Sequence, residues 1–169
     1  FCAGQVAPSF DPNCAGGALM DLNVYNISYI VGLFGEPNRV NYAANIDHGI
    51  DTSGILTMDY SGFKAVSIAA KDCAAPARYI IQGTKGYIMQ KSTANCCGGI
   101  TFHPNEGKEE HYNLNGGRPR QAAEFEAFAR ALESGDRELC GRMQDTTIAV
   151  SRVLTVARRN AGIRFPCDH

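Results

Sequence analysis

The sequence lacks several features that would place it in a specialised class of protein. No apolar run approaches the ~20 residues of a membrane-spanning helix, and no signal peptide is visible. Neither sign of charge dominates, since 16 basic and 17 acidic residues leave a net charge of −1. Without a basic field to attract nucleic acid or anionic lipid, we expect neither as a partner.

Cysteines in a disulfide or metal pattern are also missing. The seven cysteines are an odd number, and none stands in a Cys-x-x-Cys pair. This favours reduced thiols in a cytoplasmic protein. The adjacent Cys96 and Cys97, with His103 and His111, could suggest zinc or a thiol nucleophile. However, neighbouring cysteines rarely share one tetrahedral ion, and no third group orients a Cys–His pair, so we predict no metal site.

The chain contains no Gly-x-Gly-x-x-Gly turn, the motif that holds a dinucleotide pyrophosphate at a helix N-terminus. The pairs Gly98-Gly99 and Gly116-Gly117 lack the third glycine and a following apolar helix. We therefore expect this chain alone to bind no nicotinamide cofactor.

What is present predicts one globular domain over residues 1–169, since the chain is 44% hydrophobic. Apolar spacing, with glycines at the expected helix ends, predicts a helix from about Gly17 to Phe34 and two late helices. Alternating apolar residues with short turns predict antiparallel strands between them. The predicted strands are 40–46, 55–60, 63–70, 77–82, 87–90, 100–103 and 110–114. This order gives an α+β fold, an open, mainly antiparallel β-sheet with helices packed on one face.

Both faces of that sheet carry apolar residues, whereas the helices suffice to cover only one. Leu56 and Met58 alternate with Ile55 on one strand, and Val66 and Ile68 oppose Phe63 on the next. We expect the uncovered sheet face to mediate self-association.

The first helix carries the pattern richest in chemistry. Asp21 and Tyr25 stand four residues apart, so on an α-helix they share one face, and the small residues Ser28 and Gly32 continue it. An acid and a phenol beside an open groove could hold a polar small-molecule substrate and move a proton. The alternatives are that Asp21 caps the helix and that Tyr25 is a core residue.

Four motifs in order resemble one known family. The first motif is Gly16-Gly17-Ala18-Leu19 followed by Asp21 and Tyr25, and it comes after Phe10-Asp11-Pro12. It is similar to the helix that follows the nucleotide domain in Gfo/Idh/MocA oxidoreductases. The stretches 79–87, 124–128 and 145–166 resemble its Gly-Thr-x-Gly hairpin, its Glu-Phe-rich helix, and its last helix with an Ile-x-Phe-Pro strand. Many members have histidine at the position of Tyr25, whereas a branch with tyrosine there includes proteins similar to dimeric dihydrodiol dehydrogenase.

The resemblance implies a fold like the C-terminal domain of glyceraldehyde-3-phosphate dehydrogenase, with the N-terminal Rossmann domain absent from this chain. It implies catalysis by Tyr25 as general acid/base on a substrate hydroxyl. Asp21 would bind the substrate or steady the catalytic group, and Asn26 is a weaker substrate-binding candidate. Because a free tyrosine has a pKa of about 10, Tyr25 needs a nearby cation. The family's lysine, in a Glu-Lys-Pro motif missing here, would supply it.

We therefore expect the substrate-binding and catalytic half of an NAD(P)-dependent oxidoreductase acting on an alcohol, sugar or cyclic diol, inactive alone and dimeric. NAD or NADP would be bound in the full-length enzyme. The main alternative is a non-catalytic oligomerisation or ligand-sensing domain of the same fold. A hydrolase using Asp21 lacks a second acid at a useful spacing, and Arg118-Pro119-Arg120 could bind an anion or form an ordinary charged loop.

Overall fold

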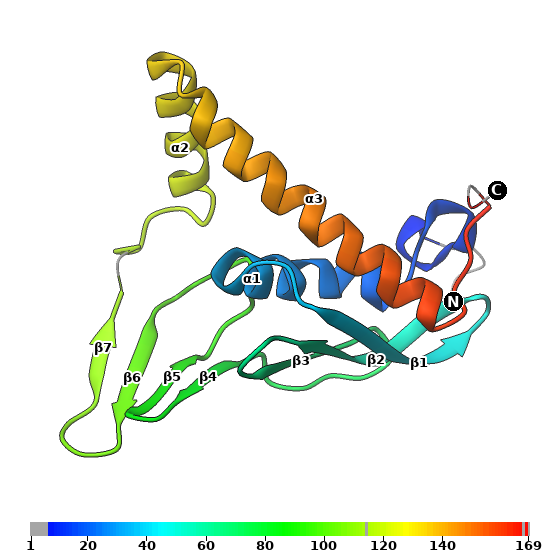
Figure 1. The fold of residues 1–169 in the computed structure, drawn as a ribbon, viewed down its shortest axis with the longest axis horizontal. Coiled ribbons are helices and arrows are strands. Elements are labelled where there is room, and N and C mark those ends of the chain that lie inside the picture. The colour runs from blue at the N-terminus through cyan, green and yellow to red at the C-terminus, as the bar shows by residue number, and fades with distance from the viewer. Residues whose placement is uncertain (1–6, 114, 167, 169) are drawn as a thin grey trace. The chain divides into compact units, whose positions relative to one another are not determined.

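The computed structural model describes residues 7–113, 115–166 and 168, which form two compact units. One unit joins the chain up to Ala74 with the chain from Gly141 onward, and the other is Ala75–Cys140. Figure 1 shows the helices and strands in chain order. They are η1 (Pro8–Phe10), η2 (Pro12–Cys14), η3 (Leu19–Asn23), α1 (Val24–Phe34), β1 (Arg39–Asp47), β2 (Ile50–Asp59), β3 (Lys64–Ala70), β4 (Tyr79–Gly83), β5 (Gly86–Gln90), β6 (Ile100–Pro104), β7 (Glu110–Tyr112), α2 (Ala122–Ser134) and α3 (Arg137–Asn160).

In the first unit, β1, β2 and β3 form an antiparallel sheet in that order. The β2–β3 connection contains the predicted Ser61-Gly62 turn. β2 begins at Ile50 rather than at the predicted Ile55. The prediction fell short because Asp51 and Thr52 are polar yet buried, which interrupts the apolar alternation that marks a strand.

Helices α1 and α3 cover one face of this sheet, as Figure 1 shows. Burying each large apolar side chain of this core contributes about 1.5–3 kcal/mol. The helices and the sheet contribute Ile27, Ile30 and Val31 from α1, Val150, Val153, Leu154 and Ala157 from α3, and Val40, Tyr42, Leu56 and Met58 from the strands, and the core also includes Leu19, Ile163 and Phe165.

The opposite face of the same sheet is open. Ile55 of β2 pairs with Ile68 of β3, and Val66 lies two residues away on the same face. These three side chains are 47%, 66% and 60% exposed, respectively. Helices on one face of open antiparallel sheets confirm the predicted α+β class, although the described strands form two sheets rather than one.

The second unit contains the other sheet, with antiparallel order β4-β5-β6-β7. The predicted turn Gly83 to Gly86 joins β4 and β5. α2 forms where the apolar spacing predicts it, but Phe125, Phe128 and Leu132 are 67%, 46% and 82% exposed. The spacing thus predicted the helix correctly, but its apolar side chains are not buried. Leu114, the predicted end of the last strand, lies outside the described residues.

The helix predicted from Gly17 to Phe34 is not a single regular α-helix. Leu19–Asn23 is a π-helix, and only Val24–Phe34 is an α-helix. A π-turn adds a residue to the turn, and such turns often occur at functional sites. Hydrophobic spacing did not reveal the π-helix. Leu19 and Ile27 are buried, and a regular α-helix over the same residues would bury them too.

A buried carboxylate fixes the start of this π-helix. Asp51 of β2 is 1% exposed, and its Oδ2 accepts hydrogen bonds from the Leu19 amide at 2.6 Å and the Tyr42 hydroxyl at 2.7 Å. Gly17 lies against the same carboxylate, since a Cβ there would stand 2.1 Å from Asp51 Oδ1. Any larger residue at Gly17 would displace either Asp51 or the helix start.

Burial governs the ionisation of this pair. Burial raises the pKa of Asp51, while the bonds from Tyr42 and the Leu19 amide and the charge of Lys71 lower it. Burial, together with Asp51, raises the pKa of Tyr42 far above its usual range. Tyr42 therefore stays protonated and donates its hydrogen to Asp51.

Replacing Tyr42 by Phe removes this donor and keeps the ring. We expect the free energy of unfolding to fall by about 1–3 kcal/mol, because a buried acceptor loses one of its donors. Tyr60→Phe is the matched control, since the Tyr60 hydroxyl donates to the Gly35 carbonyl at 2.9 Å at an exposed position. It should cost less than about 1 kcal/mol. Urea unfolding measures both, and equal losses would contradict a special role for the buried carboxylate.

Candidate functional site

Asp21 lies in the middle of the π-helix, with 46% of its side chain exposed. Its Oδ2 accepts a hydrogen bond from Lys71 Nζ at 2.5 Å. The expected alternative, a helix-capping Asp21, is not what the structure shows: Asp51 rather than Asp21 binds the first described amide of the helix, that of Leu19. The Asp21 side chain is thus half-exposed, and one of its carboxylate oxygens is held by the Lys71 ammonium group.

Lys71 was not predicted from the sequence. It follows the last residue of β3, fifty positions from Asp21 along the chain, and only 5% of its side chain is exposed. The available signal was a lysine directly after the small apolar residues Ala69 and Ala70, where a strand was expected to end. No spacing rule connects such a lysine with the first helix.

Tyr25 lies in the first turn of α1 and is 48% exposed, so it does not belong to the buried core. Ser28 and Gly32 are exposed as well, and a Cβ added at Gly32 would meet nothing within 4 Å. The π-turn at Asp21 alters the angle between Asp21 and Tyr25 from that of a regular α-helix. An acid and a phenol on exposed turns of one helix can both reach a ligand in solvent.

Asn26 takes part in a polar cluster that ties the helix to β3. Its Nδ2 donates to Asn23 Oδ1 at 3.1 Å and to Ser67 Oγ at 3.0 Å. Ser67 Oγ in turn donates to the buried Asn23 Oδ1 at 2.5 Å. Asn23 Nδ2 is buried without a hydrogen-bond partner among the described residues. This cluster holds the helix turn beside Tyr25 against the sheet.

The histidines of the second unit form pairs rather than a metal centre. His103 Nδ1 lies 2.7 Å from Glu109, and its ring stacks on Tyr87 with centroids 4.4 Å apart. His111 Nδ1 lies 3.0 Å from Thr101 Oγ1. Within the described residues, no three His, Cys, Asp or Glu side chains are grouped to hold a metal ion.

Other charged side chains form exposed ion pairs. Arg118 pairs with Glu126 at 3.0 Å, and His48 lies in the β1–β2 turn with Nδ1 2.8 Å from Asp47. Cys2, Cys167 and His169 lie outside the described residues. The five described cysteines are free thiols, namely Cys14, Cys73, Cys96, Cys97 and Cys140.

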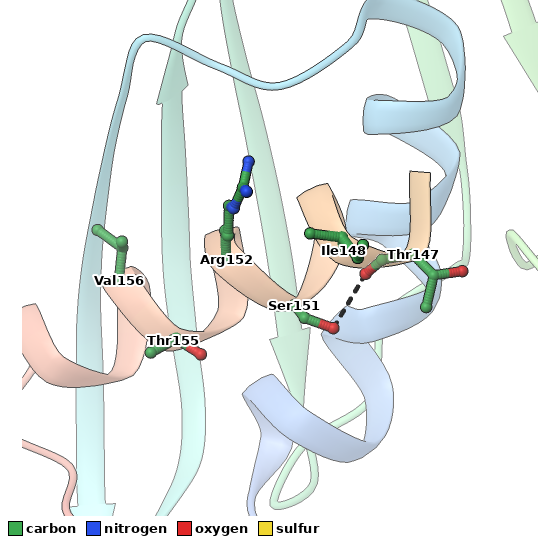
Figure 2. Close-up of a pocket in the computed structure, with 6 residues that line it drawn as sticks. All are labelled: Thr147, Ile148, Ser151, Arg152, Thr155 and Val156. Carbon is green, nitrogen blue, oxygen red and sulfur yellow. Dashed lines mark hydrogen bonds between the residues drawn. The ribbon is translucent and has the colours of Figure 1, made fainter. Parts of the chain in front are cut away.

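A shallow hollow of about 340 Å³ lies along α3, and Figure 2 shows the side chains that line it. All of its lining comes from this one helix, and the Ser151 hydroxyl donates to the Thr147 carbonyl at 2.9 Å. Neither Asp21 nor Tyr25 lines it, so the hollow and the candidate site are different places. The helices in the described part of the chain are all too short or too polar to cross a membrane.

Comparison with known proteins agrees with the motifs. Residues 4–89 match the sequence model of the GFO/IDH/MocA C-terminal domain. The scyllo-inositol 2-dehydrogenase (NADP(+)) IolU of Bacillus subtilis is 29% identical over 99% of this chain and 51% of its own length. The D-xylose 1-dehydrogenase (NADP(+)) 2 of Haloferax volcanii is 30% identical over 82% of this chain and 44% of its own length. The chain thus spans about half the length of these relatives.

A solved structure supports the fold. The aldose-aldose oxidoreductase from Caulobacter crescentus, complexed with glycerol, superposes with a TM-score of 0.69 at 18% identity, covering 94% of this chain and 50% of that one. The family match extends over 86 of the 169 residues, from 4 to 89, and includes Asp21, Tyr25 and Lys71. The chain therefore belongs to the GFO/IDH/MocA C-terminal domain family, as its sequence motifs predicted.

Proposed function

We propose that this chain is the substrate-binding and catalytic half of an NAD(P)-dependent oxidoreductase that acts on an alcohol, a sugar or a cyclic diol. The observation that carries the proposal is the pair of exposed side chains, Asp21 and Tyr25, on one helix of a GFO/IDH/MocA domain. Relatives named as inositol and xylose dehydrogenases support the substrate class.

In the proposed reaction, Tyr25 exchanges a proton with the substrate hydroxyl that becomes, or derives from, a carbonyl. Asp21 accepts a hydrogen bond from a neighbouring hydroxyl through Oδ1, because its Oδ2 is engaged by Lys71. Asn26 is the third proposed substrate contact, and its amide bonds to Asn23 and Ser67 hold it beside Tyr25. Together these groups orient one carbon of the substrate.

The cofactor belongs to the other half of the full-length enzyme. A dinucleotide pyrophosphate commonly binds at a helix N-terminus, but here the Leu19 amide already binds the Asp51 carboxylate, and Gly17 packs against it. This carboxylate would repel a phosphate, so this helix start does not fit a dinucleotide pyrophosphate. When bound elsewhere, NAD or NADP supplies the hydride transfer.

The alternative is a non-catalytic oligomerisation or ligand-sensing domain of the same fold. The open sheet face with Ile55, Val66 and Ile68 favours it, because self-association would need that face and not Tyr25. Self-association is compatible with either function, and the substitution of Tyr25 distinguishes a catalytic domain from a non-catalytic one.

We expect the protein to associate through this open sheet face. Replacing Val66 and Ile68 together by lysine should convert a dimer into a monomer, since two lysines from each protomer would be buried against those of its partner. Leu132→Lys is the control, because Leu132 is 82% exposed on α2. Sedimentation velocity measures the outcome; a wild-type monomer at high micromolar concentration would contradict association.

The chain by itself should neither turn over substrate nor bind a nicotinamide dinucleotide at micromolar concentration. The reason is the absent glycine-rich turn and the occupied helix start. Calorimetric titration of the isolated chain with NADH and NADPH tests this. Micromolar binding would contradict the assignment of the cofactor to the other half.

In the full-length protein, Tyr25→Phe deletes only a hydroxyl. We expect kcat to fall by about 10²- to 10⁴-fold, the usual contribution of a positioned acid/base. KM should change much less, because the lost interaction acts mainly in the transition state. Asp21→Asn should damage both constants, since Asp21 also binds the ground state. Rates with NADP or NAD and a panel of scyllo-inositol, D-xylose and a cyclic trans-diol measure these effects.

Tyr60→Phe is the control for this test, because the Tyr60 hydroxyl bonds the carbonyl of Gly35, at the opposite end of α1 from Tyr25. Its turnover should equal that of the wild type. If Tyr25→Phe stays within a few-fold of wild type while the wild type is active, Tyr25 is not the acid/base and the non-catalytic alternative gains support.

A further inference from the structure

The ion pair between Lys71 and Asp21 is built differently from the other ion pairs of the same sheet. Lys64 pairs with Asp59 at 2.7 Å, but the Lys64 side chain is 69% exposed. Lys71 pairs with Asp21 at 2.5 Å with a side chain only 5% exposed. Here the cation is buried and its acidic partner faces solvent, whereas in the Lys64–Asp59 pair the acid is only 22% exposed and the cation faces solvent.

Contacts from η1 and β2 hold Lys71 in place. The Phe10 ring of η1 lies 4.5 Å from Nζ, a cation–π contact. The Lys71 amide donates to the Thr52 carbonyl of β2 at 2.7 Å, which continues the β2–β3 pairing beyond Ala70. The carboxylate of the neighbouring Asp51 attracts the same charge. Lysine side chains usually move freely, but this one is already fixed before any substrate binds.

An anchor that is fixed in advance can orient a mobile group at little further entropic cost. Asp21, at 46% exposure, would otherwise sample several rotamers on the surface of the π-helix. The bond to Lys71 selects the orientation in which Oδ2 points to the ammonium group. Oδ1 then remains available to a ligand on the exposed side.

We propose that Lys71 is a positioning residue, which holds the Asp21 carboxylate in the one orientation that receives a substrate hydroxyl. This rests on the proposed function, in which Asp21 binds the substrate. Lys71 does not touch the substrate, because the Asp21 side chain and the Phe10 ring cover its ammonium group. Its entire effect on turnover therefore passes through Asp21.

A double-mutant cycle in the full-length protein tests this dependence. The variants are Lys71→Met, Asp21→Asn and both together, and the substrate is whichever of scyllo-inositol or D-xylose the wild type turns over faster. We expect Lys71→Met to lower kcat/KM about 10- to 100-fold, chiefly through KM, as loss of alignment at a binding group does. In the Asp21→Asn background the same change should alter kcat/KM less than about 3-fold, since contacting residues are not additive.

Two further variants separate positioning from general stability. Lys71→Arg keeps the cation and should recover most of the kcat/KM lost in Lys71→Met. Lys64→Met, which removes the exposed lysine of the same strand, should leave KM unchanged. If Lys71→Met does not fold, as judged by circular dichroism, Lys71→Arg takes its place in the cycle. Its smaller loss should likewise depend on Asp21.

The proposal is overturned if Lys71→Met leaves KM unchanged, or if it lowers kcat/KM by the same factor with and without Asp21. It is also overturned if Lys71→Arg is as damaging as Lys71→Met, since the charge would then be irrelevant. Absence of turnover in the wild type would end the proposed function and this role of Lys71 together. An active wild type with an uncoupled Lys71 would end only the latter.

Discussion

The structure of the first unit depends on one buried carboxylate. A carboxylate with 1% exposure is unfavourable in a protein interior unless hydrogen bonds compensate for its lost hydration. Asp51 obtains them from the Tyr42 hydroxyl of β1 and from the Leu19 amide at the start of the π-helix. These two bonds join a strand, its neighbour and a helix at one point. The requirement to satisfy Asp51 therefore sets where the helix begins, and with it the position of every side chain on its first turns.

The site inherits its geometry from this junction. Because the helix starts against Asp51 and opens as a π-turn, Asp21 comes to lie above the end of β3, where Lys71 meets it. One turn later, Asn26 bonds to Ser67 on the same strand. Two contacts to β3 thus hold the helix on either side of Tyr25. An exposed phenol carried by a helix that is fastened at both neighbouring turns can be directed at a ligand without large rearrangement.

Sequence patterns predicted the elements of this fold better than the contacts of the site. Val40, Tyr42, Leu56 and Met58 are buried as their alternation predicted, because strand periodicity follows directly from backbone geometry. Asp51 and Lys71 escaped prediction for a different reason. Asp51 contacts the first helix from 32 residues away and Lys71 from 50 residues away, and no local periodicity predicts such tertiary contacts. A π-turn is equally invisible, because it shifts the helical phase by one residue within an apolar segment.

The distribution of charge at the junction bears on the kind of molecule that could bind there. The positive charge of Lys71 is buried beneath Phe10 and Asp21, whereas the negative charge of Asp21 is half-exposed. A second carboxylate, Asp51, lies behind the helix start, where other proteins bind phosphate. An anionic ligand would meet the half-exposed carboxylate of Asp21, whereas the Lys71 ammonium group is buried. A neutral ligand with several hydroxyl groups would instead find an acceptor in Asp21 and a donor in Tyr25. The electrostatics of the chain thus favour the uncharged alcohols, sugars and diols of the proposed reaction over phosphorylated ones.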